Sequence, residues 1–152
     1  MRRLLLLLTA VCLSGCNLDV AQPANDPSDP ATETFSPSLG IDLSTMTKTA
    51  DGVYYKDLIV GAGTSLSGLP YIEFTFAGFV KSGASFAAGQ EDTPVLLGSE
   101  IPGLQEGMQG MRIGGQRLIV IPSALGFGAI NNGSVPANST LIFEIQLDDI
   151  PQ

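Results

Sequence analysis

The stretch that decides the fold is Glu100–Gly128, with the sequence EIPGLQEGMQGMRIGGQRLIVIPSALGFG. A residue before proline is disfavoured in the α region, and proline suits the first position of a helix, so we expect a helix to begin at Pro102. Leu104, Met108 and Met111 then follow at helical spacing and form one apolar stripe. The stretch therefore predicts a short helix, followed by a glycine turn and a β-strand.

Four runs of residues predict the strands of a sheet: Val53–Ile59, Tyr71–Phe79, Arg117–Ile121 and Leu141–Leu147. The second and fourth runs alternate apolar and polar residues, as antiparallel strands with one buried face do. The apolar face needs a cover, and the strongest helix candidate is Pro102–Arg112. The pattern predicts an α+β fold, a curved antiparallel β-sheet wrapped on one short α-helix.

These runs resemble the motifs of the FKBP-type peptidyl-prolyl cis-trans isomerases. The resemblance rests on three separate stretches, namely Phe74–Gly78 with Gly83 and Phe86, Glu100–Gly128, and Val135–Leu147. They follow one another in the family's order within residues 47–152. The resemblance implies the FKBP fold, prolyl isomerase activity on proline-containing peptides, and an apolar pocket that holds the proline.

The same resemblance assigns site residues one at a time. The positions that match the catalytic pocket are Phe76, Phe86, Ile101, Leu104, Phe127 and Phe143, and those that match substrate-binding positions are Val95, Glu100 and Val135. In the family, the backbone N–H of the residue that matches Ile101 binds the substrate carbonyl. Without the resemblance, aromatic residues such as these are more often ordinary core.

Several pocket positions depart from the family's pattern. Phe76 and Phe127 replace tyrosines, Leu104 replaces a tryptophan, Ala87 replaces an aspartate, and Glu100 replaces an apolar residue. Two hydroxyls and one carboxylate are thereby lost. Each lost hydrogen bond to a ligand costs roughly 0.5–1.5 kcal/mol, so we expect poor binding of the family's macrolide inhibitors.

Composition excludes several other functions. The chain has 152 residues, 44% of them hydrophobic, which is enough for one core, and its formal net charge is −8. No basic patch favours nucleic-acid binding. The chain has no histidine, and its acidic residues lack metal-ligand spacing, so neither a metal nor another cofactor is predicted. Prolyl isomerisation requires none of these groups.

The N-terminus predicts export and lipidation. Arg2 and Arg3 precede the apolar run Leu4–Leu13, which is too short to span a membrane and is typical of a signal peptide. Leu13–Cys16 resembles a bacterial lipobox, so residues 1–15 are interpreted as a lipoprotein signal peptide and Cys16 as the lipidated residue. An ordinary signal peptide that leaves a free thiol is the alternative. Zinc or redox chemistry at the two cysteines is strongly disfavoured.

Residues 16–45 are predicted to form a disordered tether that begins at the lipidated cysteine. The segment after Cys16 contains four prolines and five acidic residues but no lysine or arginine, a composition that argues against a packed core. The isomerase domain is then residues 46–152. The predicted location is the bacterial cell envelope, with a lipid anchor in a membrane and the domain facing the periplasm or the exterior.

Three functions remain open at this point. The first is a prolyl isomerase that assists the folding of unfolded exported proteins. The second is a non-catalytic peptide-binding chaperone or adaptor on a degenerate FKBP fold, which the lost pocket residues motivate. The third is a structural envelope lipoprotein, which the long acidic tether motivates. No oligomerisation element is evident, which favours a monomer.

Overall fold

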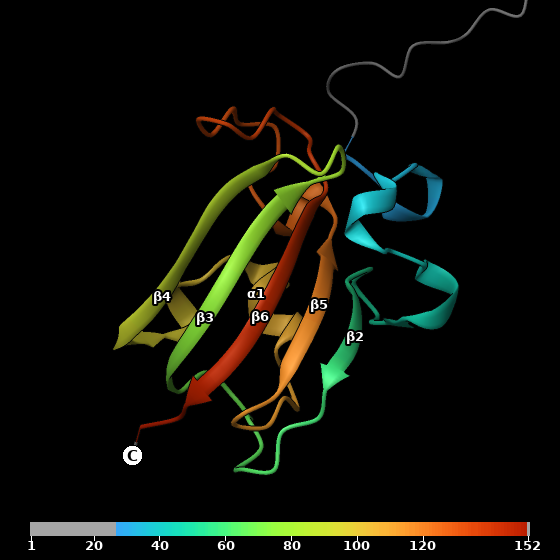
Figure 1. Ribbon diagram of the computed structural model, residues 1–152. Coiled ribbons are helices and arrows are strands. Elements are labelled where there is room, and N and C mark those ends of the chain that lie inside the picture. The colour runs from blue at the N-terminus through green and yellow to red at the C-terminus, as the bar shows by residue number, and fades with distance from the viewer. Residues whose placement is uncertain (1–26, 152) are drawn as a thin grey trace, which may run out of the picture.

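The computed structural model describes residues 27–151. Its main element is one antiparallel sheet of six strands in the order β1-β2-β5-β6-β3-β4. The strands are β1 (Thr47–Lys48), β2 (Tyr54–Ile59), β3 (Tyr71–Val80), β4 (Ser85–Leu96), β5 (Gln116–Ile121) and β6 (Leu141–Asp149). The last strand, β6, lies between β5 and β3, with helix α1 behind the sheet (Figure 1).

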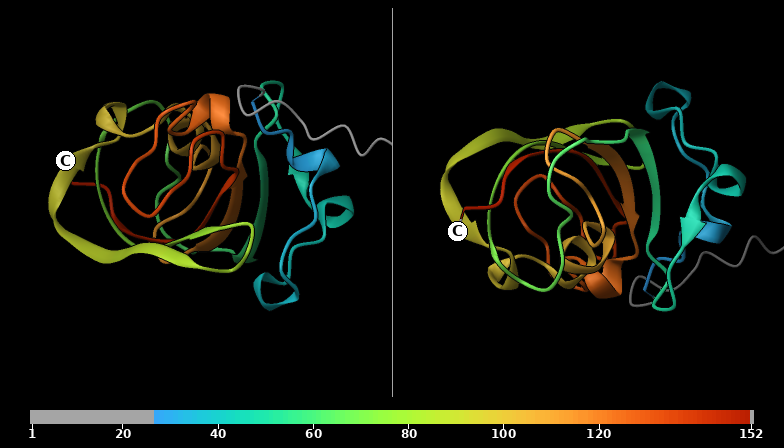
Figure 2. Two further views of the ribbon diagram at one scale, coloured as in Figure 1. Left: turned by 90° about the horizontal axis from the view of Figure 1, so that it is seen from above. Right: turned by 90° about the horizontal axis from the view of Figure 1, so that it is seen from below.

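The short helix α1 (Pro102–Gly107) covers the inner face of the sheet. The sheet curves around this helix and the neighbouring loops (Figure 2). Inward residues of the strands, such as Ile119 and Ile145, are fully buried in one cluster with Leu104, Met108 and Met111. The predicted fold, a curved antiparallel sheet on one short helix, is confirmed.

Two glycines one helical turn apart allow α1 to approach β5 closely. A Cβ atom on Gly103 would overlap the side chain of Ile121, and one on Gly107 would lie 2.6 Å from Cγ2 of Ile119. Because any larger residue at these positions would push the helix off the sheet, the spacing of the two glycines sets the depth of the inner layer.

The predicted helix Pro102–Arg112 ends earlier, at Gly107. The chain turns after Met108 because Gly110 adopts a positive φ of 75° and donates its N–H to the carbonyl of Leu66. Met108 and Met111 remain buried, since the turn carries the apolar stripe onward.

Strand β4 was not predicted. Its sequence contains alanines, a glycine and Pro94, which have low β propensity. Pairing along β3 overrides that propensity, and Pro94 is tolerated because β4 is an edge strand of the sheet.

Residues 27–46, here called the N-terminal strap, lie on the outer face of the sheet (Figure 2). The strap contains the 3-10 turns η1 (Pro30–Thr32), η2 (Pro37–Leu39) and η3 (Leu43–Thr45). Its apolar side chains cover Tyr54, Val120 and Ile142, all of them buried, and these strap residues are Phe35, Leu39, Ile41, Leu43 and Met46.

The predicted boundary between tether and domain is therefore wrong for residues 27–45. Outward-facing apolar residues of β5 and β6 need a cover, and the strap supplies it. Two of the acidic residues that suggested disorder, Asp29 and Asp42, are exposed and accept hydrogen bonds from backbone N–H groups in η1 and η3, whereas the side chain of Glu33 is largely buried beside Lys81. The earlier part of the tether and the predicted signal peptide lie outside the described residues.

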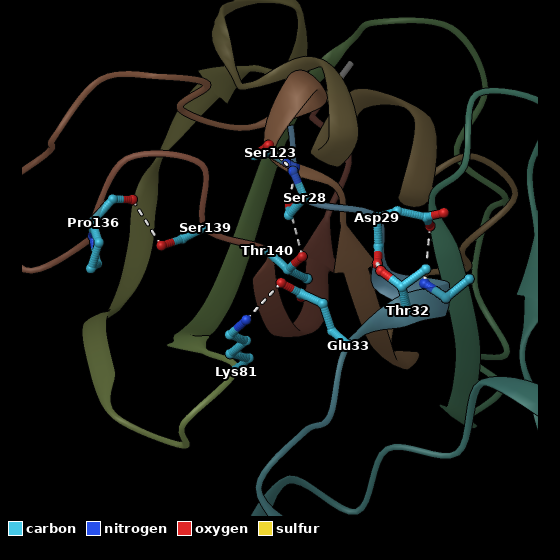
Figure 3. A network of polar contacts seen from close by, with 10 residues as sticks. Ser28, Asp29, Thr32, Glu33, Lys81, Ser123, Pro136, Ser139 and Thr140 are labelled. Atoms are coloured by element: carbon cyan, nitrogen blue, oxygen red, sulfur yellow. Dashed lines mark hydrogen bonds and ion pairs between the residues drawn. The ribbon is translucent and has the colours of Figure 1, made fainter. Parts of the chain in front are cut away.

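Polar contacts fasten the start of the strap (Figure 3). Ser28 donates its N–H to Oγ of Ser123 at 2.8 Å, and Ser123 returns its N–H to Oγ of Ser28 at 2.9 Å. The hydroxyl of Thr140 bonds Ser28 as well, and Glu33 pairs with Lys81 at 2.9 Å. Ser123 and Thr140 are fully buried, so the strap satisfies polar groups that would otherwise lack partners.

Within residues 27–151, no helix has the length and apolar character that a membrane-spanning helix needs.

Candidate active site

A cavity of about 190 Å³ opens on the inner face, between β3, β4, the start of α1 and the loop after β5. A cavity needs roughly 10–15 Å³ to hold one water molecule. This cavity is many times larger, so it has room for a side chain or a small ring. It is lined by all six residues predicted at catalytic positions, Phe76, Phe86, Ile101, Leu104, Phe127 and Phe143, and by Glu100. Their catalytic role stays a prediction.

The aromatic residues of the cavity hold one another at fixed angles. The ring of Phe86 meets those of Phe143 and Phe127 edge-on, with centroids 5.5 Å and 6.2 Å apart. Phe76 lies 6.5 Å from Phe143 in a tilted arrangement. Edge-to-face contacts contribute about 0.5–1.5 kcal/mol each beyond burial, so the apolar walls are well ordered.

Gly78 in β3 makes room for the ring of Phe86. A Cβ atom on Gly78 would lie 2.7 Å from Cζ of that ring, which is closer than carbon atoms can approach. Phe86 therefore folds down over the strand instead of standing away from it. This packing explains why residue 78 is a glycine.

Ile101 brings a backbone donor to the cavity. It is the N-cap of α1, with φ −59° and ψ 145°, and its carbonyl accepts hydrogen bonds from the N–H groups of Leu104 and Gln105. In the described part of the chain, no group accepts a hydrogen bond from the N–H of Ile101. The helix start thus uses the carbonyl of this residue and leaves its N–H available to a ligand.

Leu104 and Phe127 do not fill the hollow. Leu104 is 3% exposed and lies at the base of the site, where α1 meets the core. Phe127 follows η5 (Ser123–Leu125), and its loop is held by hydrogen bonds from Gly128 to Ser123 and from Asn138 to Gly128. The replacement of larger or hydroxylated residues at these two positions leaves an open apolar cavity.

Two of the predicted substrate-binding residues lie elsewhere. Val135 is buried to 2% exposure in the core, and Val95 packs against the same core without lining the cavity. The cavity is also lined by Ala87, which the resemblance placed at a pocket position, and by Phe74 and Glu91, which were not predicted as site residues. Glu91 was missed because it belongs to β4, a strand that the sequence did not predict, in which it pairs opposite Phe74 and therefore faces inward.

Two carboxyl groups give the cavity its charge. Burial raises the pKa of the Glu100 carboxyl above its ordinary value, and the Glu91 carboxylate raises that pKa further. Among the described side chains, which exclude that of Asp92, no cluster of histidine, cysteine and acidic residues is placed to hold a metal ion. The site combines apolar walls, one free backbone donor and an acidic border.

Arg117 in β5 fixes the position of α1, a role that the sequence reasoning missed. Its side chain is 4% exposed and binds Asp57 on β2 through two hydrogen bonds, of 2.7 Å and 3.1 Å. It also donates to the carbonyl of Gly107, the last residue of the helix, at 2.9 Å and to that of Gln109, two residues further on, at 2.8 Å. Its guanidinium lies over the ring of Tyr55. A buried cation thus satisfies the carbonyl end of the helix that carries the cavity base.

A comparison with protein families matches residues 67–148 to the model described as FKBP-type peptidyl-prolyl cis-trans isomerase. The chain belongs to this family. The matched FKBP segment contains β3, β4, α1, β5 and nearly all of β6, and with them every residue named above as lining the cavity. The N-terminal strap lies outside it.

Individual relatives agree with the FKBP assignment. The peptidyl-prolyl cis-trans isomerase Mip of Chlamydia pneumoniae is 40% identical over 96 residues, which are 61% of this chain and 36% of Mip. An FK506-binding protein of Neisseria meningitidis is 34% identical over 63% of this chain and 94% of its own length. FK506-binding protein 4 of Chaetomium thermophilum is 32% identical over 75% of this chain. The matched part is only 23% of that longer protein.

Solved structures show the same architecture. A peptidyl-prolyl cis-trans isomerase from Pseudomonas syringae superposes with a TM-score of 0.63 at 29% identity, covering 71% of this chain and 82% of that one. FkpA from Escherichia coli superposes with a TM-score of 0.64 at 25% identity, covering 70% of this chain and 51% of FkpA.

Proposed function

We propose that this chain is a peptidyl-prolyl cis-trans isomerase that assists the folding of exported proteins. The observation that supports the proposal most directly is the apolar cavity beside the unpaired N–H of Ile101. X–Pro isomerisation is slow enough to limit folding, so a catalyst that acts on newly exported chains has a physical purpose.

The mechanism needs no titrating group. The barrier of about 18–20 kcal/mol to rotation of a peptide bond comes from amide resonance, which the twisted bond loses. The planar amide separates charge, and an apolar, water-poor cavity stabilises that separation less than water does. A cavity that fits the twisted prolyl bond better than either planar isomer therefore lowers the barrier. The N–H of Ile101 holds a substrate carbonyl while the bond rotates.

The donor role of Ile101 can be tested by Ile101→Pro. The φ of −59° lies within proline's range, and Glu100 before it is extended with ψ 165°, so the backbone can accept the substitution. Because the N–H makes no hydrogen bond in the described fold, its removal leaves no acceptor unpaired. We expect kcat/KM to fall about tenfold or more, since an unpaired buried carbonyl of the substrate costs about 1–3 kcal/mol.

The assay measures how the full chain, in a non-ionic detergent, accelerates a refolding reaction that is limited by proline isomerisation. Ile101→Ala is the matched control, because it shortens the side chain to a similar degree but keeps the N–H. A loss that is equal in both variants contradicts the donor role. No acceleration by the unmodified chain at micromolar concentration contradicts the enzymatic function itself.

A second candidate function is a non-catalytic chaperone or adaptor that binds proline-containing peptides. Leu104 and Phe127 favour it, because they stand where the family has a larger ring and a hydroxyl. It predicts suppression of aggregation without faster refolding. Phe143→Ala, which removes one wall of the cavity, then weakens peptide binding, whereas unchanged binding excludes the cavity as the binding site.

We also propose that Cys16 carries a lipid anchor in the bacterial envelope, on the basis of the lipobox resemblance alone. Metabolic labelling with a radioactive fatty acid tests this directly, with Cys16→Ser as the variant that should lose the label. Label that survives in Cys16→Ser contradicts the assignment.

A further inference from the structure

The cavity carries two carboxylates that come from different elements. Glu91 belongs to the edge strand β4 and faces inward because it pairs opposite Phe74, whereas Glu100 directly precedes Ile101, the N-cap of α1. Both line the cavity, and neither side chain has a hydrogen-bond or ion-pair partner among the side chains that the structure describes, which are those of residues 27–151 without Asp92. The two carboxylates therefore border an apolar hollow from two directions without a counter-ion from the described chain.

The positive charges of the described chain lie elsewhere. Residues 27–151 contain five basic side chains, which are Lys48, Lys56, Lys81, Arg112 and Arg117. Two of them form ion pairs away from the cavity, two donate hydrogen bonds to other groups, and one lies over the ring of Tyr54. None of the five lines the cavity. A cation that relieves the repulsion between the two carboxylates must therefore come with a ligand.

Lysine and arginine side chains have the shape that this arrangement fits. Their apolar stems pack along hydrophobic surface while the charged end stays at a polar border. Phe86 and Phe74 provide apolar wall beside the two carboxylates. We propose that the cavity prefers X–Pro segments in which a lysine or arginine adjoins the proline, with Glu91 and Glu100 receiving its charge. The preference rests on the proposed isomerase function, which it refines.

A role in solubility alone accounts for only one of the two residues. Inward-facing charges on edge strands discourage pairing between sheets, and Glu91 lies on such a strand. Glu100 is not on a strand, yet it lines the same cavity, and its carboxyl is near enough to Glu91 for the charge there to raise its pKa, as burial also does. The convergence of both groups on one hollow is what indicates a ligand.

The test uses matched peptides and the full chain in a non-ionic detergent. In one pair, lysine or uncharged norleucine directly precedes the proline, and in a second pair it directly follows. Isomerisation is followed at equilibrium by NMR exchange, and binding by titration of the same peptides. The variants are Glu91→Gln, Glu100→Gln and the double variant. Glu144→Gln is the control, because it removes the same charge from an exposed position on β6 outside this cavity.

We expect the lysine peptide of at least one pair to exceed its norleucine partner in kcat/KM by a factor of roughly two to five for each carboxylate, as partly exposed ion pairs allow. The ratio should fall in each single variant, approach one in the double variant, and stay unchanged in Glu144→Gln. It should also shrink in 0.5 M salt, because screening weakens partly exposed pairs.

A ratio of one in both pairs overturns the preference while leaving isomerase function intact, provided that the norleucine peptides are isomerised. A ratio that persists in the double variant also overturns the preference, because groups other than Glu91 and Glu100 would then bind the lysine of the peptide. If no peptide is isomerised, the proposed isomerase function fails. The preference for a basic residue is then judged from the ratio of the affinities of the lysine and norleucine peptides, which should change in the variants as described for kcat/KM.

Discussion

The two faces of the sheet are covered in different ways. On the inner face, α1 approaches β5 through Gly103 and Gly107, and a loop carries Phe127 to the remaining space, which stays partly open as the cavity. On the outer face, the N-terminal strap lays its apolar side chains over Val120 and Ile142, which are fully buried. One β-sheet thus presents a site on one side and a fastened chain segment on the other.

The two covers also differ in how they relate to the family model. The family match, residues 67–148, includes the inner cover and the cavity but not the strap. The inner cover depends on glycines and a buried arginine that set a close distance, whereas the outer cover depends on apolar side chains and three 3-10 turns. Damage to the inner cover should therefore disturb function as well as stability, and damage to the outer cover should mainly reduce stability.

The largest effect is expected for Arg117→Met. The substitution leaves the carbonyls of Gly107 and Gln109 without their donor and Asp57 without its partner. Loss of one member of such an ion pair costs about 3 kcal/mol, at the lower end of the usual range because Asp57 is partly exposed. Because the same donors hold α1, we also expect weaker peptide binding at temperatures where the variant is still folded.

Denaturant unfolding and peptide titration measure the two effects. Arg112→Met is the control, since Arg112 is exposed and donates one side-chain hydrogen bond, to the carbonyl of Gly63. Equal stability of the two variants would show that the buried arginine does not fix the inner cover.

A smaller effect is expected for Phe35→Ala in the strap. Phe35 is half-buried against the outer cluster, so its truncation should cost about 1–2 kcal/mol, less than the 3–5 kcal/mol of a fully buried phenylalanine. Because the cavity lies on the other face, kcat/KM for a neutral peptide should change less than twofold. A stability equal to that of the unmodified chain, measured by the same denaturant method, would mean that the packing of Phe35 on the outer cluster does not stabilise the folded state.

Much of the inner face could be predicted from the sequence. The bounds predicted for the strands with alternating residues differ from the observed bounds by one or two residues. The prediction Leu141–Leu147 corresponds to β6, Leu141–Asp149, and the prediction Tyr71–Phe79 corresponds to β3, Tyr71–Val80. The motif resemblance brought six aromatic and aliphatic residues to one cavity without any structural information. Local periodicity and ordered motifs suffice where each strand buries one face.

The outer face could not be predicted in the same way. The strap has the prolines and acidic residues of a disordered segment, and only the apolar Phe35, Leu39, Ile41 and Leu43 argued against that interpretation. A second signal lay in β5 and β6, where Val120 and Ile142 are apolar although the alternation places them outward. Contacts between such distant segments are set by tertiary packing, as is β4, which its own propensity did not indicate.

The smallest effect is expected at the mouth of the cavity, for Glu100→Gln. Burial and the charge of Glu91 raise the pKa of Glu100 in the folded state, so the folded chain holds this proton to higher pH than the unfolded chain does. The free energy of unfolding therefore falls as pH rises from the pKa of Glu100 in the unfolded chain to its pKa in the folded chain. Above both values, the full loss of stability from ionising this carboxyl is present. The variant removes the cost, so its Tm should exceed that of the unmodified chain at pH 7, and the excess should vanish near pH 4. Because the carboxyl is partly exposed, the difference in Tm should remain below about 2 °C.

Thermal scans at both values of pH, with Glu144→Gln as the control, measure this difference. A lower Tm of Glu100→Gln at pH 7 would show that the Glu100 carboxylate stabilises the folded state. The charge at the cavity would then not reduce the stability of the chain.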